Sequence, residues 1–190
     1  YPYSKKGRVL YAELLRKRGL PGKQLAELKF LAGIGKADTA VSDAIEIYSS
    51  LLEDSVSRAW SLDQYSLPKR PYRLAVFTLP DRGEGVHTAG SAVLLRYLKD
   101  LLAGSSRLSV LPLAAEARSP AEAFRRAREA EADYYLVFRA RETERDLELS
   151  GELRVARTGS PASVFRAYRS GNDRVKNTAS RLASLVEGAL

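Results

Sequence analysis

The sequence predicts an α/β protein with a mixed sheet of about five strands, preceded by a small helical region. Three observations support this prediction. Apolar residues within 8–60 repeat at three- and four-residue steps, as on amphipathic helices. Beyond residue 73, short apolar runs alternate with helical patterns, which favours strand–helix–strand units with parallel strands. Later, two segments of alternating polarity flank a turn at 158–161, which predicts an antiparallel hairpin.

The helical region is expected to contain three helices. Gly19 and Pro21 end the first helix, and the glycines at 33 and 35 end the second. Asp38 is a good N-cap for a long third helix. The amphipathic pattern of the first helix is read from Val9, Leu10, Glu13, Leu14 and Lys17.

The domain organisation follows from a change of pattern near residue 70. Residues 61–72 contain Pro68 and Pro71, which resist helix and favour extended chain. We therefore expect a helical amino-terminal region at 1–60, a linker at 61–72 and an α/β domain at 73–190.

Three apolar runs of the α/β domain are expected to be strands, and the first lacks the alternation of a half-exposed strand, so it should be buried on both faces. The runs are 74–79, 108–113 and 134–138. Ser119 is an N-cap, Pro120 suits the first helical position and Glu122 completes a capping box, so a helix should cover 121–132. The element order is then β-α-β-α-β-β-β-α, in which the last helix runs from Val175 to Leu190.

Composition excludes several kinds of chemistry. There is no cysteine, so disulfides, thiolate metal sites and cysteine nucleophiles are absent, and the single histidine excludes a multi-histidine metal site within one chain. We expect no metal, no cofactor, no catalytic residue and no small-molecule substrate. The sequence starts at Tyr1 and not at methionine, so we expect a processed protein or a fragment.

The net charge of +8 permits binding to nucleic acid, acidic polymers or anionic membranes without requiring any of them. Residues 1–70 carry 12 basic and 8 acidic groups, and residues 71–190 carry 19 and 15, so each part has about the same excess. No basic tail stands out, and mixed signs are typical of a solvated, salt-bridged surface.

The loop at 83–90 is the first place to look for an enzyme site, because ligands of open α/β sheets bind at the carboxyl ends of strands. Its Gly85 and Gly90 have phosphate-loop spacing, but Ser91 and Ala92 stand where lysine and a hydroxyl are needed. His87 could act as a base, yet Asp81 and Glu84 are its only acidic neighbours in sequence and nothing fixes their geometry.

The turn at 33–36 resembles a helix-hairpin-helix motif. In that motif a glycine–hydrophobic–glycine hairpin offers backbone N–H groups to a nucleic-acid phosphate. Gly33, Gly35 and Lys36 are therefore the candidate nucleic-acid residues of an alternative function, while a plain helix terminator explains the same glycines.

The aromatic residues of the strands allow two readings. They could stack on bases, but at strand spacing such residues more often form core contacts and cross-strand pairs. They are Tyr134, Tyr135, Phe138, Phe165 and Tyr168.

Three segments carry a resemblance to one group of bacterial envelope domains. They are the opening strand and proline at 73–80, the Ala-Asp-Tyr strand entry at 131–138 and the strand with its Thr-Gly turn at 153–159. Through them, residues 73–190 resemble the α/β domain of TolB amino-terminal domains, FlgT middle domains and CsgG- and LpoB-like lipoproteins. Residues 1–72 have no counterpart in that resemblance.

The resemblance implies a non-enzymatic protein of the bacterial envelope, either periplasmic or associated with the outer membrane as a lipoprotein. It implies a scaffold or accessory role through protein–protein contacts, with flagellar or secretion machinery among the expected settings and a homo-oligomer among the expected assemblies. It transfers no catalytic residue.

Overall fold

The computed structural model describes residues 4–58, 68–80, 88–114, 116–142, 146–171 and 173–190. The chain divides into two compact units, Tyr1–Tyr65 and Ser66–Leu190. The boundary falls within 61–72, the segment expected to be a linker, and most of that segment lies outside the described residues. Within the described residues, no helix combines the length and apolar character needed to span a bilayer.

The first unit consists of three helices, α1 (Lys5–Lys17), α2 (Pro21–Gly33) and α3 (Thr39–Arg58). They share one apolar core, whose buried members are Ala12 of α1, Leu25, Leu28 and Leu31 of α2, and Val41 and Tyr48 of α3. Local signals set the boundaries: Gly19 and Gly35 adopt positive φ angles of 71° and 69° after α1 and α2. Asp38 accepts a hydrogen bond from the Val41 N–H at 3.0 Å, as an N-cap should.

The rotation of α1 differs from the one read from sequence. Ala12 and Leu15 are buried, whereas Leu10 and Leu14 are 58 % and 46 % exposed. Two contacts of Arg8 fix this rotation, because its guanidinium bonds to Glu27 at 2.6 Å and lies 4.0 Å from the centre of the Phe30 ring. Packing against α2 therefore outweighs the apolar pattern of α1 alone.

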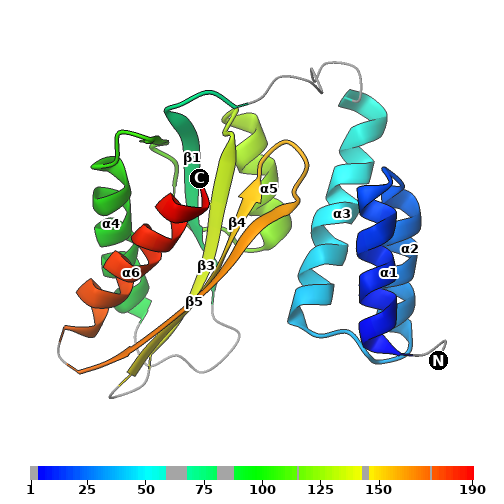
Figure 1. Cartoon of the computed structure of the whole chain (residues 1–190), viewed down its shortest axis with the longest axis horizontal. Coiled ribbons are helices and arrows are strands. Elements are labelled where there is room, and N and C mark those ends of the chain that lie inside the picture. The colour runs from blue at the N-terminus through cyan, green and yellow to red at the C-terminus, as the bar shows by residue number, and fades with distance from the viewer. Residues whose placement is uncertain (1–3, 59–67, 81–87, 115, 143–145, 172) are drawn as a thin grey trace. The chain divides into compact units, whose positions relative to one another are not determined.

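The second unit is built on a mixed five-stranded sheet in the order β2-β1-β3-β4-β5 (Figure 1). The strands are β1 (Tyr72–Thr78), β2 (Leu108–Val110), β3 (Tyr134–Glu142), β4 (Asp146–Val155) and β5 (Pro161–Ser170). β1 pairs in parallel with β2 and β3, and β3-β4-β5 are antiparallel. Helices α4 (Thr88–Ala103), α5 (Pro120–Glu129) and α6 (Arg174–Ala189) complete the order expected from sequence.

The sheet has helices on both faces (Figure 1). Helices α4 and α6 cover one face, where their leucines pack on Leu74, Val76, Leu136 and Phe138 of the central strands and on the inward residues of β4 and β5. Helix α5 lies on the other face, where Phe124 packs against Tyr135 with ring centres 6.1 Å apart. The fold class predicted from sequence is confirmed.

Two elements are shorter than expected. β2 ends at Val110 and not at residue 113, although the Leu111 N–H still donates to the Leu74 carbonyl at 2.9 Å. Pro112 follows and has no N–H to continue the ladder. Helix α5 ends at Glu129 because Glu131 takes a positive φ of 51°, which is incompatible with a continuing helix.

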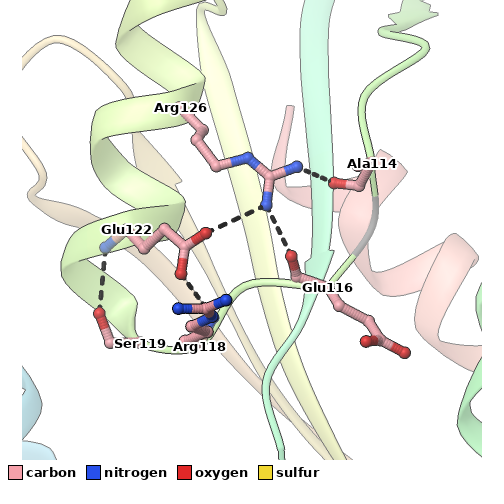
Figure 2. A network of polar contacts seen from close by, with 6 residues as sticks. All are labelled: Ala114, Glu116, Arg118, Ser119, Glu122 and Arg126. Atoms are coloured by element: carbon pink, nitrogen blue, oxygen red, sulfur yellow. Dashed lines mark hydrogen bonds and ion pairs between the residues drawn. The ribbon is translucent and has the colours of Figure 1, made fainter.

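A polar network centred on Arg126 anchors the connection between β2 and α5 (Figure 2). The Arg126 guanidinium donates to the carbonyl oxygens of Ala114 and Glu116, the latter at 2.6 Å, and lies 3.6 Å from the Glu122 carboxylate. It also lies 5.0 Å from the centre of the Phe77 ring. One side chain of α5 thus binds the connection to the end of β1.

The capping residues predicted at the start of α5 form the expected cap, except that the Glu122 carboxylate binds a different N–H group (Figure 2). The Ser119 hydroxyl accepts from the Glu122 N–H at 3.1 Å, as the motif requires. The Glu122 carboxylate accepts from the N–H of Arg118, at 2.9 Å, and so binds one residue earlier than a capping box does. Glu122 therefore joins the cap to the Arg126 network.

Removing the cap of α3 should destabilise the helical unit. We expect Asp38→Ala to lower the free energy of unfolding by about 1 kcal/mol, because an orphan N–H at the helix start loses its acceptor. Asp38→Asn keeps the cap and loses only a half-exposed ion pair with Lys5, so it should cost less. Urea unfolding followed by circular dichroism measures both. Equal costs for the two variants would contradict the cap as the dominant contribution.

The same group gives a pH dependence. A hydrogen bond from Lys5 is the main cause that lowers the pKa of Asp38 below 3.8. A carboxyl whose pKa is lowered by folding stabilises the protein above its unfolded pKa and loses this contribution as pH falls through the folded value. We therefore expect the wild-type advantage over Asp38→Asn to be full at neutral pH and to shrink as pH falls below the ordinary aspartate pKa of about 3.9.

Loss of Arg126 should destabilise the α/β unit. Arg126→Ala leaves the carbonyls of Ala114 and Glu116 without this donor, and we expect a cost of about 1–3 kcal/mol. Arg125→Ala, on an exposed neighbour in the same helix, is the matched control and should change stability by less than about 0.5 kcal/mol. Similar values for both variants would show that the network contributes nothing.

Candidate functional site

The carboxyl ends of the parallel strands are the place where an α/β enzyme would bind its ligand. The loop expected to serve that purpose holds Asp81, Glu84 and His87, and residues 81–87 lie outside the described residues. Gly90 lies within the first turn of α4. The expectation that this loop holds no catalytic or phosphate-binding residue therefore stays a prediction.

Two basic groups near the end of β2, Lys99 and Arg126, bind the protein's own backbone. Lys99 of α4 donates to the Leu113 carbonyl at 3.0 Å, and Arg126 holds the next carbonyls of the same connection. Burial, and then the positive charge of Arg126, lowers the pKa of Lys99. Within the described ranges, no three His, Asp or Glu side chains cluster closely enough to hold a metal ion.

The turn at 33–36 forms a helix end whose backbone donors are used within the chain. The N–H groups of residues 34, 35 and 36 donate to the carbonyls of Phe30, Ala32 and Leu31 at 3.1, 3.0 and 3.0 Å. This is the pattern of a helix that closes on a left-handed glycine. A phosphate bound here would have to compete with these bonds, so the role of Gly33, Gly35 and Lys36 in nucleic-acid binding stays a prediction.

The strand aromatics divide between the core and the surface. Tyr135, Phe138 and Phe165 are buried. Tyr134 packs edge to face with Tyr72 at 5.5 Å between ring centres. Tyr168 is 55 % exposed, so these five residues do not form one base-stacking surface.

The hairpin β4–β5 has one face packed on a helix and one outward face. Its inward residues pack on α6, but its outward residues lie on the same side of the sheet as α5, which packs on β3 and not on β5. We call this surface the hairpin face. It comprises Glu148, Ser150 and Glu152 of β4 and Val164, Arg166 and Tyr168 of β5.

The hairpin face combines apolar side chains with charges of both signs. Val164 is 70 % exposed and Tyr168 55 %. Arg166 lies 3.6 Å from Glu148, an exposed pair whose contribution to stability is small. A hydrogen bond with the Asp146 carboxylate is the main cause that raises the pKa of Tyr168. Apolar residues within a mixed polar border are typical of a protein-binding surface.

Next to this face, β5 forms one edge of the sheet. It is ten residues long and pairs with β4 on one side, so its other row of backbone groups points away from the sheet. Such an edge is a template for pairing with another chain, and charged side chains on it restrain unspecific pairing. Arg166 and Arg169 supply such charges.

The sequence predicted the hairpin and drew attention to Tyr168 as a strand aromatic, but it did not single out the other residues of the open face. The pairing of Val164 with Glu152 and of Tyr168 with Glu148 places them together. The available signal was the alternation in 161–170, because buried Phe165 and Ala167 fix which neighbours face outward.

Comparison with solved structures finds several of low sequence identity. PelC from Paraburkholderia phytofirmans is 18 % identical over 66 % of this chain and 93 % of its own, with a TM-score of 0.47. TolB from Acinetobacter baumannii is 14 % identical with a TM-score of 0.45, and the match spans 66 % of this chain and 29 % of TolB. The LpoB C-terminal domain from Salmonella enterica is 16 % identical over 63 % of this chain and 95 % of its own, with a TM-score of 0.39.

About two thirds of the chain is similar to TolB and to the LpoB C-terminal domain, two members of the group that the sequence resembles. No curated protein matches the sequence. A family model, the second domain of TPASS_0648, matches residues 71–188, which is more than half of the chain. The chain therefore belongs to the TPASS_0648 family, and its α/β unit is the second domain of that family.

Proposed function

We propose that this protein is a non-enzymatic accessory protein of the bacterial envelope, and that it acts by binding other proteins through β5 and the hairpin face. The envelope setting, periplasmic or associated with the outer membrane, rests on the resemblance of residues 73–190 to TolB- and LpoB-like domains. The mode of action rests on the surface of the hairpin.

The observation that carries the proposal is the open edge beside exposed apolar residues. An edge strand gives a partner backbone hydrogen bonds, and side chains on one face of the strand give specificity. β5 offers an edge that is not paired with any described strand. Val164 and Tyr168 lie four residues apart on the outward face of β5. A partner strand or loop could use both features at once.

The charges of this surface favour a protein over a polyanion. Arg166 is matched by Glu148, and Arg154 by Glu152 at 2.7 Å, so the charges of these two pairs offset one another. A nucleic acid requires an excess of cations along its path. The same edge could pair with a second copy, so a homo-oligomer is one form that such contacts could take. Links to flagellar or secretion machinery stay predictions.

Cross-linking in cells tests the proposal. A photoreactive side chain placed at Val164 or Tyr168 should form protein adducts in the envelope fraction of the bacterium that carries the gene. Val93 on α4 is a matched control position, since it is an exposed valine, 49 % accessible, on a different element. We expect adducts from β5 and far fewer from position 93.

A second variant supports the same test. Val164→Thr with Tyr168→Thr should strongly reduce the adducts formed from position 166 while changing stability by less than about 1 kcal/mol, because both side chains are exposed and threonine suits a strand. Fractionation of the full-length protein into the cytosol, together with equal adducts from β5 and from Val93, would refute the proposal.

The alternative function has its own test. If the turn at 33–36 binds phosphate, Lys36→Glu should weaken DNA and RNA binding far more than Lys29→Glu, an exposed lysine on α2. Because the N–H groups of the turn are bonded within the chain, we expect both variants to have the same effect within about twofold, as unspecific charge effects do. A titration with DNA and RNA at several salt concentrations measures the affinity of both variants. A selective loss of affinity with Lys36→Glu would support the helix-hairpin-helix motif.

A further inference from the structure

Helix α1 has a second apolar surface that the three-helix core does not use. Leu10, Tyr11 and Leu14 are 58 %, 50 % and 46 % exposed. Leu14 follows Leu10 by four residues and Tyr11 by three, so the three side chains share one face of the helix. The core side of the same helix is formed by Ala12 and Leu15. We call the exposed group the α1 stripe.

Basic residues border the α1 stripe at both ends. Lys6 precedes Leu10 by one turn, and Lys17 and Arg18 follow Leu14 by three and four residues. All three basic side chains are exposed. Within α1 the only acidic residue is Glu13. The stripe therefore presents apolar side chains within a positively charged border.

From this arrangement we propose that α1 binds an anionic lipid surface. Leucine and tyrosine side chains enter the boundary between headgroups and acyl chains, while lysine and arginine contact negatively charged headgroups. This is a surface contact and not a span, because the helix has 13 residues. The proposal concerns the helical unit and does not depend on the function proposed for the hairpin.

An occupant of the stripe has to cover its apolar side chains and also neutralise its basic border. Other occupants do only one of the two. A second copy docked on the stripe would bring Lys6, Lys17 and Arg18 against the same residues of its partner, which like charges oppose. A nucleic acid would satisfy the cations and leave the three apolar side chains in water. An anionic bilayer satisfies both, over its whole surface and without a groove of matching shape.

The ion pairs of the helical unit keep the stripe pointing outward. Lys5 bonds to Asp38 at 2.6 Å, and Arg8 bonds to Glu27 at 2.6 Å and stacks over Phe30. These contacts bind the core side of α1 to α2 and to the start of α3. The helix therefore offers the stripe as a preformed surface, and lipid binding needs no rotation of α1.

Vesicle flotation with the 190-residue chain tests the proposal. The probes are phosphatidylcholine vesicles with about 30 % phosphatidylglycerol and vesicles of phosphatidylcholine alone. We expect binding to the anionic vesicles, little binding to the neutral ones, and a marked loss between about 0.05 and about 0.5 M salt.

Two double variants separate the two components of the surface. Leu10→Ser with Leu14→Ser removes the apolar part, and Lys6→Glu with Lys17→Glu reverses the charge at both ends. Each should weaken binding at least about tenfold, because each removes one of the two attractions on which interfacial helices depend. Circular dichroism should show an unchanged fold, since all four side chains are exposed.

Matched controls change the same chemistry elsewhere. Val93→Ser with Leu101→Ser removes two exposed apolar residues of α4, and Arg125→Glu with Arg181→Glu changes the net charge by the same amount as the α1 charge variant. Neither should change binding more than about twofold. Equal losses from the controls would mean unspecific adsorption and would overturn the proposal.

A site-specific probe reads out insertion directly. The protein has no cysteine, so Leu14→Cys and Val93→Cys each provide a single labelling site. An environment-sensitive dye at position 14, and not at position 93, should shift to shorter emission wavelength on anionic vesicles. The absence of a shift at position 14 would overturn the proposal. Concentration-dependent dimerisation would also overturn it, if the Leu10→Ser with Leu14→Ser variant abolishes that dimerisation, and would show that the stripe binds a second copy of the chain.

Discussion

Burial of the two central strands on both faces is the constraint on which the α/β unit depends. Leu74 through Phe77 of β1 and Tyr135 and Leu136 of β3 have essentially no exposed surface. A strand buried in this way needs a helical layer on each side, and a parallel partner needs a crossover. Helices α4 and α5 are those crossovers, so the requirement of the central strands determines the order of the chain from β1 to β3.

The same constraint explains why the far side of the sheet is open. Antiparallel strands need no crossover, and β3-β4-β5 is joined without one. Only α6 is then left to cover β4 and β5, and it covers one face, through Leu182 and Val186 against Leu149 and Phe165. The hairpin face is thus a consequence of topology, and its mixed charges and exposed Val164 suit the protein contacts proposed for it.

Features of the fold that depend on local sequence signals could be predicted, whereas features that depend on contacts between distant segments could not. The fold class, the strand order along the chain and the caps at Asp38 and Ser119 could be read from sequence, because runs, periods and capping residues are local. The bonds of Arg126 to two carbonyls could not, because they depend on where the connection after β2 lies in space. The rotation of α1 was misread for the same reason: Arg8 selects it through Glu27 and Phe30 on another helix.

That misreading carries the most information about function. A helix whose strongest apolar residues faced the core would need no further partner. Here small Ala12 faces the core, where it permits close packing on α2, and the larger Leu10, Tyr11 and Leu14 face outward. Exposing such residues is unfavourable in water by about 25 cal/mol for each Å². The exposed surfaces of the two units therefore have different origins. The sheet has an open edge because its topology requires one, whereas α1 exposes apolar side chains because ion pairs fix its rotation.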